Sequence, residues 1–496
     1  MKIPRSIYNW VSISGFIIAV NSALLILILF IFSELTTNPN IYNGVFTYII
    51  LPVILIIGLI LIPIGMLIKR KRIKESDQRW PVLDLNRSNA RQGLVLISVL
   101  TFLFLIVSAM GSYEAFNYTE SVDFCGRLCH KVMNPEYVTY QNSPHARVAC
   151  VECHVGQGAS WYVKSKLSGM YQVYSVLFHK YPSPLPTPIA NLRPARETCE
   201  KCHWPQKFYA RSLRTQRGYL TDSLSTEWNI SMLMKTGPTY SSLGLIEGIH
   251  WHINPSVKIE YIASSKDRES IPWVKYTNLK TGEVQIFQDT TNILDKKVKD
   301  SLVIRSMDCM DCHNRPSHSF KSASVYVDNA IVKGDIPKEL PFIKKVAMNI
   351  LKGPFNTNDS ALMYIHDSVT NFYKKGYPEI YRNNKNLVDQ AIKGIQGEFA
   401  KNVFPEMRVT SEKYLNHIGH LESDGCFRCH SDRHKSDKGK FISKDCNLCH
   451  TIIAQGPTKD MKYASINELM GFIHPIDVKD NWKTYFCSEC HRVLYP

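Results

Sequence analysis

The chain has 496 residues, of which 45% are hydrophobic, and its formal net charge is +16. This length allows several domains. Much of the hydrophobic content lies near the N-terminus, so the remainder needs something besides a large apolar core to organise it. The basic residues after residue 112 are scattered, which argues against nucleic acid as a partner.

Three apolar runs occupy the first part of the chain, at Val11 to Phe32, Val45 to Ile68 and Leu94 to Met110. The first two exceed the length needed to cross the hydrocarbon core of a bilayer, and the third is near the lower limit. A secretory signal peptide would show one short apolar run and a small-residue cleavage site. Three runs separated by loops therefore predict a permanent membrane anchor.

The distribution of positive charge predicts the orientation of this anchor. The loop from Lys69 to Arg91 opens with KRKRIK, whereas the loop from Ser33 to Gly44 contains no Lys or Arg. Because positively charged loops stay on the cytoplasmic side, the N-terminus with Lys2 and Arg5 and the 69–91 loop are predicted to be cytoplasmic. The chain after the third run then lies on the opposite side of the membrane.

All fourteen cysteines occur in seven short pairs, and a histidine directly follows each pair. Six pairs have the spacing C-x-x-C-H, and the first has one additional residue. The seven motifs are Cys125/Cys129/His130, Cys150/Cys153/His154, Cys199/Cys202/His203, Cys309/Cys312/His313, Cys426/Cys429/His430, Cys446/Cys449/His450 and Cys487/Cys490/His491. C-x-x-C-H is the attachment signature of c-type haem, in which the histidine is the proximal ligand of the iron. Zinc knuckles and redox disulfides also use C-x-x-C but need no histidine beside it.

Seven covalently bound haems would also account for the charge and the location. Each haem carries two propionates, so about fourteen negative charges would offset most of the formal charge of +16. Covalent haem attachment is completed outside the bacterial cytoplasm, which agrees with the predicted orientation. The sequence therefore predicts a protein of the bacterial cytoplasmic (inner) membrane whose haem domains face the periplasm.

The segments between the motifs show three kinds of pattern. Residues 160–179 combine apolar and aromatic residues in a way that suits a helix on the membrane interface. Residues 257–263, 271–276 and 283–288 alternate or are rich in β-branched and aromatic residues, which predicts a small antiparallel sheet. From about Ala323 to Pro405 the apolar residues recur at helical spacing.

These patterns together predict a mostly α and irregular multihaem cytochrome c fold with an N-terminal anchor of three transmembrane helices and a small antiparallel β insertion. Five segments are expected. They are the anchor (1–111), a first domain with three haems (112–205), a β-containing segment with the fourth haem (206–322), a helical segment (323–425) and a C-terminal cluster of three haems (426–496).

Ten histidines lie outside the motifs, and a six-coordinate iron needs one further ligand on its distal side. We expect these ligands to include His145, His252, His318, His420, His434 and His474. His250 competes with His252, because alternate residues of a strand point to the same face. His179, His366 and His417 are less favoured. For the first haem the candidate is Met133, whose alternative role is apolar packing.

The stretch from Tyr118 to Gly158, YTESVDFCGRLCHKVMNPEYVTYQNSPHARVACVECHVGQG, resembles the start of the NapC/NirT/NrfH family of membrane-anchored multihaem quinol dehydrogenases. That family has a transmembrane helix before the first haem, a methionine after the first motif and an S-P-H histidine before the second. The segments CHWPQKF, IHWHIN, CMDCHNRPSH and GHLESDGCFRCH resemble a longer seven-haem branch that includes inner-membrane quinol-oxidising cytochromes of metal-respiring bacteria. The longer first motif, the position of Met133 and the three membrane spans depart from the usual pattern.

This resemblance implies oxidation of a membrane quinol, menaquinol in the first place or else ubiquinol, beside the first haem in anaerobic respiration. Relatives use a lysine and a nearby acid there, which points to Lys164 or Lys166 and to Asp123. Electrons would then pass along the haems to a periplasmic or outer-membrane cytochrome or reductase. A terminal reductase of nitrite, hydroxylamine or sulfite is an alternative, although such enzymes often replace a motif histidine by lysine. An electron-transfer subunit of a larger membrane complex is another. The sequence leaves the oligomeric state open.

Overall fold

The computed structural model describes residues 8–35, 46–71, 85–155, 158–188, 193–205, 208–237, 248–295 and 302–492. The chain divides into two compact units. The first contains the residues up to Met133 together with Ala149–Val151, and the second contains Asn134–Val148 and the residues from Glu152 onward. Lys2, Arg5 and residues 36–45 and 72–84, which carry most of the predicted orientation, lie outside the described residues.

The first unit is helical. Its elements are α1 (Trp10–Leu35), the π-helical turn η2 (Phe46–Ile50), α3 (Leu51–Lys71), α4 (Ser88–Glu120) and α5 (Val122–Arg127). Three stretches are long and apolar enough to cross a membrane, at Trp10–Phe32, Phe46–Lys69 and Arg91–Glu120. The predicted helical anchor is thus confirmed, and the third helix extends beyond the predicted run at both ends.

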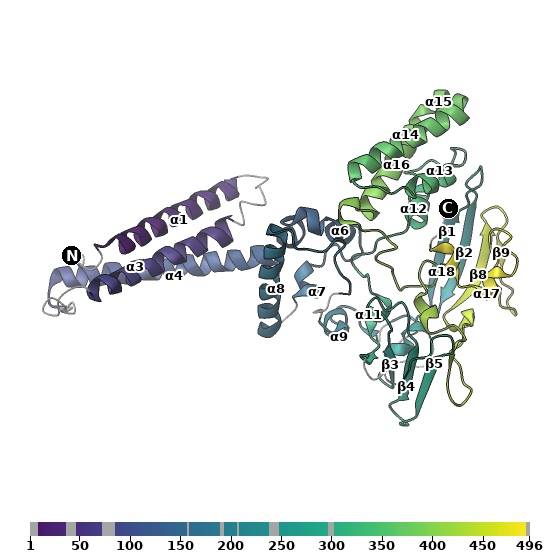
Figure 1. Cartoon of the computed structure of the whole chain (residues 1–496), viewed down its shortest axis with the longest axis horizontal. Helices are drawn as coiled ribbons and strands as arrows, with labels where there is room; N and C mark the ends of the chain where they lie inside the picture. The colour runs from purple at the N-terminus through teal and green to yellow at the C-terminus, as the bar shows by residue number, and fades with distance from the viewer. Residues whose placement is uncertain are drawn as a thin grey trace. The chain divides into compact units, whose positions relative to one another are not determined.

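Helices α1 and α3 pack closely along their length (Figure 1). A Cβ atom added to Gly15 would lie 2.7 Å from the carbonyl oxygen of Gly58, and one added to Gly58 would lie 2.8 Å from the amide nitrogen of Ala19. The Ser12 hydroxyl donates to the Ile62 carbonyl at 2.8 Å. Small residues that let two backbones approach, supported by a hydrogen bond between helices, are typical of helix packing within membranes.

The second unit begins with short helices around the first motifs. Helix α6 (His130–Gln141) and helix α7 (Cys150–His154) each begin in the first unit and end in the second. Helices α8 (Ala159–Leu177) and α9 (Ala195–Cys199) follow. Helix α8 confirms the helix predicted between residues 160 and 179. Later motifs lie on α11 (Cys309–Cys312), η7 (Gly425–Arg428), η8 (Cys446–Leu448) and α18 (Cys487–His491). The remaining short elements are η5 (Ile249–Ile253), η6 (Pro405–Met407) and α17 (Asn481–Thr484).

A five-stranded antiparallel sheet has the order β6-β3-β4-β5-β7. Its strands are β3 (Val257–Ile262), β4 (Trp273–Asn278), β5 (Val284–Asp289), β6 (Arg305–Ser306) and β7 (His434–Lys435). The three central strands are those that the alternating pattern predicts. Ile259, Tyr261 and Phe287 are buried in its small core.

A second, four-stranded sheet has the order β1-β2-β8-β9. It consists of β1 (Ser212–Tyr219), β2 (Glu227–Met234), β8 (His450–Pro457) and β9 (Lys462–Tyr463). Strand β2 pairs with β8 from Trp228↔Pro457 to Met234↔His450, with a bulge between Ser231 and Met232. The sequence did not predict this sheet. His450, the histidine of the motif that begins on η8, is also the first residue of β8.

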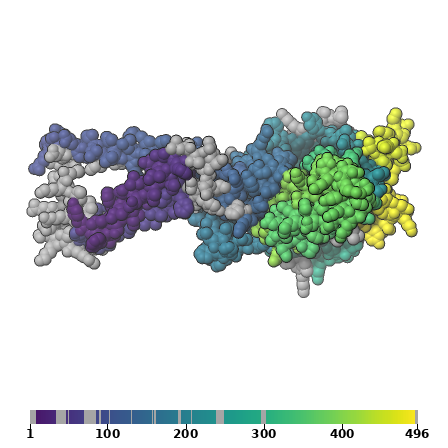
Figure 2. Space-filling model, turned by 90° about the horizontal axis from the view of Figure 1, so that it is seen from above, coloured from purple at the N-terminus to yellow at the C-terminus, as the bar shows by residue number. Residues whose placement is uncertain are grey.

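The helical segment forms a compact block (Figure 2), which we call the helical module. Its helices are α12 (Ala323–Lys333), α13 (Ile343–Leu351), α14 (Asn358–Gly376), α15 (Pro378–Asn383) and α16 (Lys385–Asn402). Val327, Ile365 and Val388 are among its fully buried residues. Each large aliphatic side chain buried in this way contributes about 1.5–3 kcal/mol. The module therefore has an apolar core of its own.

Candidate functional site

Each of the seven cysteine motifs lies on or directly beside a short helical turn. Residues three or four apart on a helix lie on the same face, so both thiols of a motif are presented side by side. This holds for Cys309 and Cys312 on α11, whereas in the longer first motif Cys125 lies on α5 and Cys129 lies in the turn that follows it. All fourteen cysteines are free thiols in the structure. No group of three or more His, Cys, Asp or Glu residues in the described ranges is arranged to hold a bare metal ion.

The second thiols of three motifs differ in their local structure and exposure. Cys153 and Cys490 lie on the same helices as their partners, α7 and α18, whereas Cys202 lies in the turn that follows α9. The Cys202 amide donates to the Cys199 carbonyl at 3.2 Å, so this turn keeps the two thiols of its motif close. Cys202 and Cys490 are exposed, and Cys153 is half-buried. Attachment of haem to these three thiols stays a prediction of the motif spacing.

Six motif histidines each face a second histidine ring that belongs to no motif. The ring centroids of these pairs are 5.8–6.4 Å apart. The pairs are His145 and His203 (6.1 Å), His154 and His318 (6.3 Å), His250 and His313 (6.4 Å), His252 and His430 (5.8 Å), His420 and His450 (6.2 Å), and His474 and His491 (6.1 Å). Two imidazoles on opposite sides of one metal ion, each bound at about 2 Å, have centroids roughly 6 Å apart. The spacing therefore fits one iron between the rings of each pair.

Hydrogen bonds orient most of these partner histidines. In five of them Nδ1 lies within hydrogen-bond distance of a backbone carbonyl oxygen, an arrangement that fixes the tautomer and leaves Nε2 as the ligand atom. These contacts are His145 with Pro316 (3.1 Å), His250 with Thr236 (2.9 Å), His252 with Ile249 (2.8 Å), His318 with Glu136 (2.9 Å) and His474 with Ile476 (2.8 Å). In the sixth pair, the Nδ1 atoms of His420 and His450 are buried and have no partner among the described residues.

Burial keeps several paired rings neutral. Burial in the first place, and the facing histidine in the second, lower the pKa of His318, His420 and His430 to about 4. Burial also lowers the pKa of His154 and His252. Only the neutral imidazole can bind a metal, so these rings are prepared as ligands at neutral pH.

Two other histidines use their nitrogens differently. The ring of His434 is fully buried, and its Nε2 lies 2.7 Å from the Ile271 carbonyl oxygen. His417 contacts the Asp311 carbonyl through Nδ1 and the Glu269 carboxylate through Nε2, at 3.3 and 2.7 Å. Neither arrangement leaves a free Nε2. The structure thus places His434, which we expected as a ligand, in a structural hydrogen bond.

The structure places the rings of His250 and His252 beside different motifs. The expected strand is the 3₁₀ helix η5, in which residues two apart lie roughly 240° apart around the axis. Their rings consequently face different motifs, His313 and His430. The H-W-H sequence carried this signal, but only a helical reading of the segment would have revealed it.

The first motif extends from α5 to the start of α6. His130 begins α6, and its side chain lies outside the described part of the structure. Met133 is half-buried on the same helix, and its amide donates to the Cys129 carbonyl at 2.9 Å. Asp123, in the first turn of α5, forms an exposed ion pair with Arg127 at 3.2 Å.

The two candidate lysines lie on α8 and contact aromatic rings of the same helix. The Lys164 ammonium is 5.1 Å from the centre of the Trp161 ring, and that of Lys166 is 4.9 Å from the Tyr162 ring. One side of α8 is strongly exposed although it is apolar. Leu167, Met170, Tyr171 and Leu177 are each more than half exposed. Such a stripe beside cationic side chains is typical of a helix in a membrane interface.

Thiols of successive motifs lie close together. Cys125 and Cys150 are hydrogen-bonded within the first unit, and Cys199 and Cys309 within the second. Burial, with a contribution from Cys426, raises the pKa of Cys312 to about 12. Burial and the neighbouring Cys426 likewise raise the pKa of Cys449 to about 11. In the second unit the attachment points of the third to the sixth motif therefore neighbour one another in sequence order.

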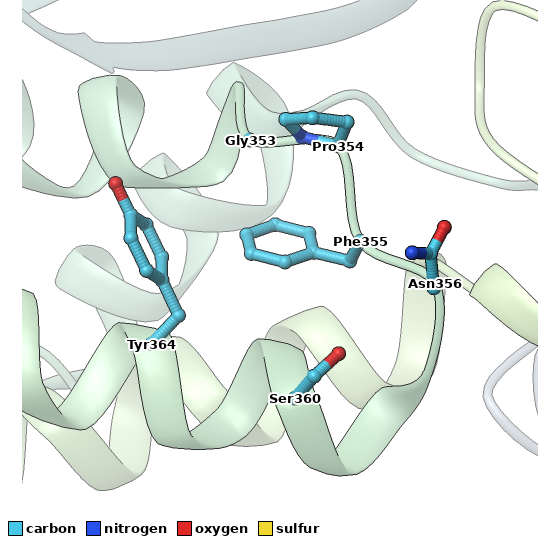
Figure 3. Close-up of a pocket in the computed structure, with 6 residues that line it drawn as sticks. All are labelled: Gly353, Pro354, Phe355, Asn356, Ser360 and Tyr364. Atoms are coloured by element: carbon cyan, nitrogen blue, oxygen red, sulfur yellow. The ribbon is translucent and has the colours of Figure 1, made fainter.

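A hollow lies in the helical module, away from the cysteine motifs (Figure 3). It has a volume of about 390 Å³ and is lined by Gly353, Pro354, Phe355, Asn356, Ser360 and Tyr364. None of the predicted site residues lines it.

Three membrane-length apolar helices and seven paired-thiol motifs that end in histidine define a membrane-anchored c-type cytochrome. A model of the NapC/NirT cytochrome c family, N-terminal region, matches residues 87–184. The chain is 41% identical over 494 residues to the cytochrome c-type protein ImcH of Geobacter sulfurreducens, a match that covers 99% of this chain and 96% of that protein. It is also 31% identical over 121 residues to the cytochrome c-type protein NrfH of Wolinella succinogenes, covering 23% of this chain and 68% of that protein.

The chain belongs to the NapC/NirT family of membrane-anchored multihaem cytochromes c. Membership implies covalently bound haem and a location in the inner membrane. No solved structure shows a significant match.

Proposed function

We propose that this protein is a seven-haem cytochrome that oxidises a membrane quinol, menaquinol in the first place, and passes the electrons to a periplasmic or outer-membrane redox partner in anaerobic respiration. The haem-binding residues would face the periplasm. The six facing histidine pairs carry this proposal, because paired imidazoles suit electron transfer and leave no open coordination position for a substrate. That arrangement disfavours the alternative of a terminal reductase.

The residues that would hold the haems follow from the motifs and the facing rings. The fourteen cysteines would attach seven haems, and the motif histidines would be proximal ligands. His318, His145, His250, His252, His420 and His474 would be the distal ligands for the second to the seventh haem, in that order. His130 and Met133 would serve the first. When bound, the haems would supply one-electron redox centres.

Helix α8 supports quinol as the electron donor. Its apolar side chains are exposed among the described residues, and an acyl-chain region would cover them. Lys164 and Lys166 on this helix are candidates for positioning the quinol oxygen and accepting its proton, with Asp123 as the candidate acid. No Asp or Glu occurs on α8 itself.

Purified full-length protein with its haems, inserted into phospholipid nanodiscs, provides the test. Anaerobic mixing with the menaquinol analogue menadiol should reduce the haems rapidly without a second protein. The same preparation should not consume nitrite, hydroxylamine or sulfite when an artificial donor keeps it reduced. Reduction by dithionite but not by menadiol would overturn the proposal. Turnover of one of those substrates would establish the terminal reductase instead.

A further inference from the structure

The short helix η5 is fixed firmly to the end of strand β2. The Ile249 amide donates to the Lys235 carbonyl at 2.9 Å, and the His250 amide donates to that of Thr236 at 3.3 Å. Gly248 precedes the helix with φ +102°, and a Cβ atom there would lie 2.5 Å from the Lys235 carbonyl oxygen. A glycine is therefore required for this close approach.

The two histidines of η5 face two different motifs. The His250 ring lies nearly parallel to that of His313, with an interplanar angle of 10°. The His252 ring is nearly perpendicular to that of His430, at 85°. Trp251, between them, stacks on Tyr276 with centroids 5.6 Å apart. One helical turn thus presents the facing rings of the fourth and the fifth motif.

The attachment turns of these two motifs are also joined directly. Arg428, inside the fifth motif, is buried and donates through Nη2 to the carbonyl of Asp311, inside the fourth motif, at 2.8 Å. The same guanidinium donates to the Arg268 carbonyl at 2.9 Å and to the Gly425 carbonyl at 2.8 Å. The Asp311 carboxylate accepts from Arg268 at 2.7 Å and from Tyr261.

We propose that helix η5 and Arg428 hold the fourth and fifth haem sites as one fixed pair, with His250 and His252 as the distal ligands of two different haems. This pair would join the group of motifs two to four with the group of motifs five to seven. The two ligand roles and the electron-carrying role of the junction rest on the proposed function, and the fixed pairing of the two sites is what this proposal adds. Arg428 is a positioning residue, because its guanidinium bonds to backbone carbonyls and not to the ring of His250 or His252.

A count of ligand losses in the oxidised protein tests the assignment. Replacing a distal histidine by alanine leaves one ferric haem without its sixth ligand, and this haem becomes high-spin. Full-length H250A and H252A should each show one high-spin haem in seven by electron paramagnetic resonance, and the double variant should show two. His366, which is exposed and contacts Asp367, provides the control H366A, for which no high-spin haem is expected.

The competing assignment, one haem with two alternative ligands, predicts at most one high-spin haem in the double variant. That result would overturn the proposal. Pyridine haemochrome quantification of haem must give seven per chain for every variant, so that a missing haem is not mistaken for a missing ligand. If a variant loses haem, the methionine replacements H250M and H252M retain a ligand and are scored by the methionine-to-iron absorption band, one per substituted haem. None of these measurements involves quinol, so they stand apart from the test of the proposed function.

The ring angles permit a second, independent test. Nearly perpendicular imidazole planes give a highly anisotropic low-spin signal, and nearly parallel planes give a rhombic one. Two of the six pairs have steeply inclined planes, His252 with His430 at 85° and His145 with His203 at 74°. The more anisotropic of their two signals should therefore disappear in H252A and persist in H250A. In R428M the buried positive charge is lost, so this signal should titrate at a lower midpoint potential, because a nearby cation disfavours the ferric state.

Two further arginine variants test whether the lower midpoint potential comes from the lost charge of Arg428 or from a general disturbance of the structure. R428K keeps the charge and should restore most of the potential. R433M removes an arginine that stacks on Phe486 in the same segment, and it should leave the potential unchanged. Equal shifts in R428M and R433M, or no shift in R428M, would contradict the positioning role.

Discussion

The helical module and the C-terminal haem segment, residues 410–492, organise chains of similar length in opposite ways. The module buries apolar side chains in every long helix. In residues 410–492, all of which the structure describes, the buried apolar side chains are Tyr414, Ile452, Ala454 and Phe486. That segment instead contains three thiol pairs and the facing rings of His420 and His474. We infer that side chains hold the module together, whereas the haem segment depends on its haems.

The largest expected effect follows from withholding haem. Protein produced without haem attachment should lose the structure of residues 410–492, because a group that binds only the folded state contributes its binding energy to folding. The helical module should survive, because its core is its own. Limited proteolysis with mass spectrometry would detect a resistant fragment spanning about residues 323–402. The protein with its haems, digested in parallel, should resist cleavage in both regions. Equal digestion of both regions in the haem-free protein would contradict the comparison.

A substitution of the buried Lys344 tests how the helical module is stabilised. This side chain is 1% exposed, and its ammonium lies 2.6 Å from the Asp328 carboxylate. Replacing Lys344 by methionine leaves Asp328 buried without its cation, which should lower the free energy of unfolding of the module by about 3–5 kcal/mol. Faster hydrogen exchange in α12 and α13 would show it. The neighbouring Lys345 is exposed, and K345M should cost less than about 0.5 kcal/mol. An unchanged exchange rate in K344M would show that the ion pair does not stabilise the module.

Local patterns predicted the parts of this fold in which neighbours along the chain decide the structure. The alternation in residues 257–262 predicted β3, and helical spacing predicted α12 to α16. The local pattern did not predict strand β8, because this strand begins at a motif histidine and pairs with β2, more than two hundred residues earlier. The motif spacing predicted attachment thiols and proximal histidines, but facing rings such as His154 and His318 come from distant segments.

The same limit applies to His434, which we expected as a ligand and whose hydrogen bond comes from a distant segment. His434 follows His430 by four residues, which resembles a ligand on a returning loop. Its Nε2 instead bonds the carbonyl of Ile271, a residue 163 positions earlier. No local pattern contains that contact. Conversely, nothing in the sequence CFRCH distinguishes Arg428 from an exposed arginine, and its role depends on the distant carbonyl of Asp311.

A middle-sized effect would separate the ligand histidines from the structural ones. Replacing His434 by alanine leaves the buried Ile271 carbonyl without a partner, which should cost about 1–3 kcal/mol of stability. Because the Nε2 of His434 bonds to the Ile271 carbonyl and its ring forms no pair with a motif ring among the described residues, all haems should remain low-spin in H434A. H420A should behave in the opposite way and produce one high-spin haem. A high-spin haem in H434A would assign His434 as a ligand and remove one of the facing pairs from the proposal.

The smallest effect concerns helix α8. This helix differs from both the helical module and residues 410–492, because its apolar residues are exposed and it carries no cysteine motif. If it contacts the membrane and the quinol, K166M should slow haem reduction by menadiol about tenfold or more, since a positioned proton acceptor contributes at least this much. Reduction by dithionite should be unchanged. K180M alters a lysine that contacts the Tyr174 hydroxyl just beyond the same helix and should have no effect on either rate. K164M and D123N complete the set, and the variant with the largest selective loss identifies the proton acceptor. If none of the three variants slows haem reduction by menadiol, the quinol is oxidised at another place, and the exposed face of α8 serves only to attach the protein to the membrane.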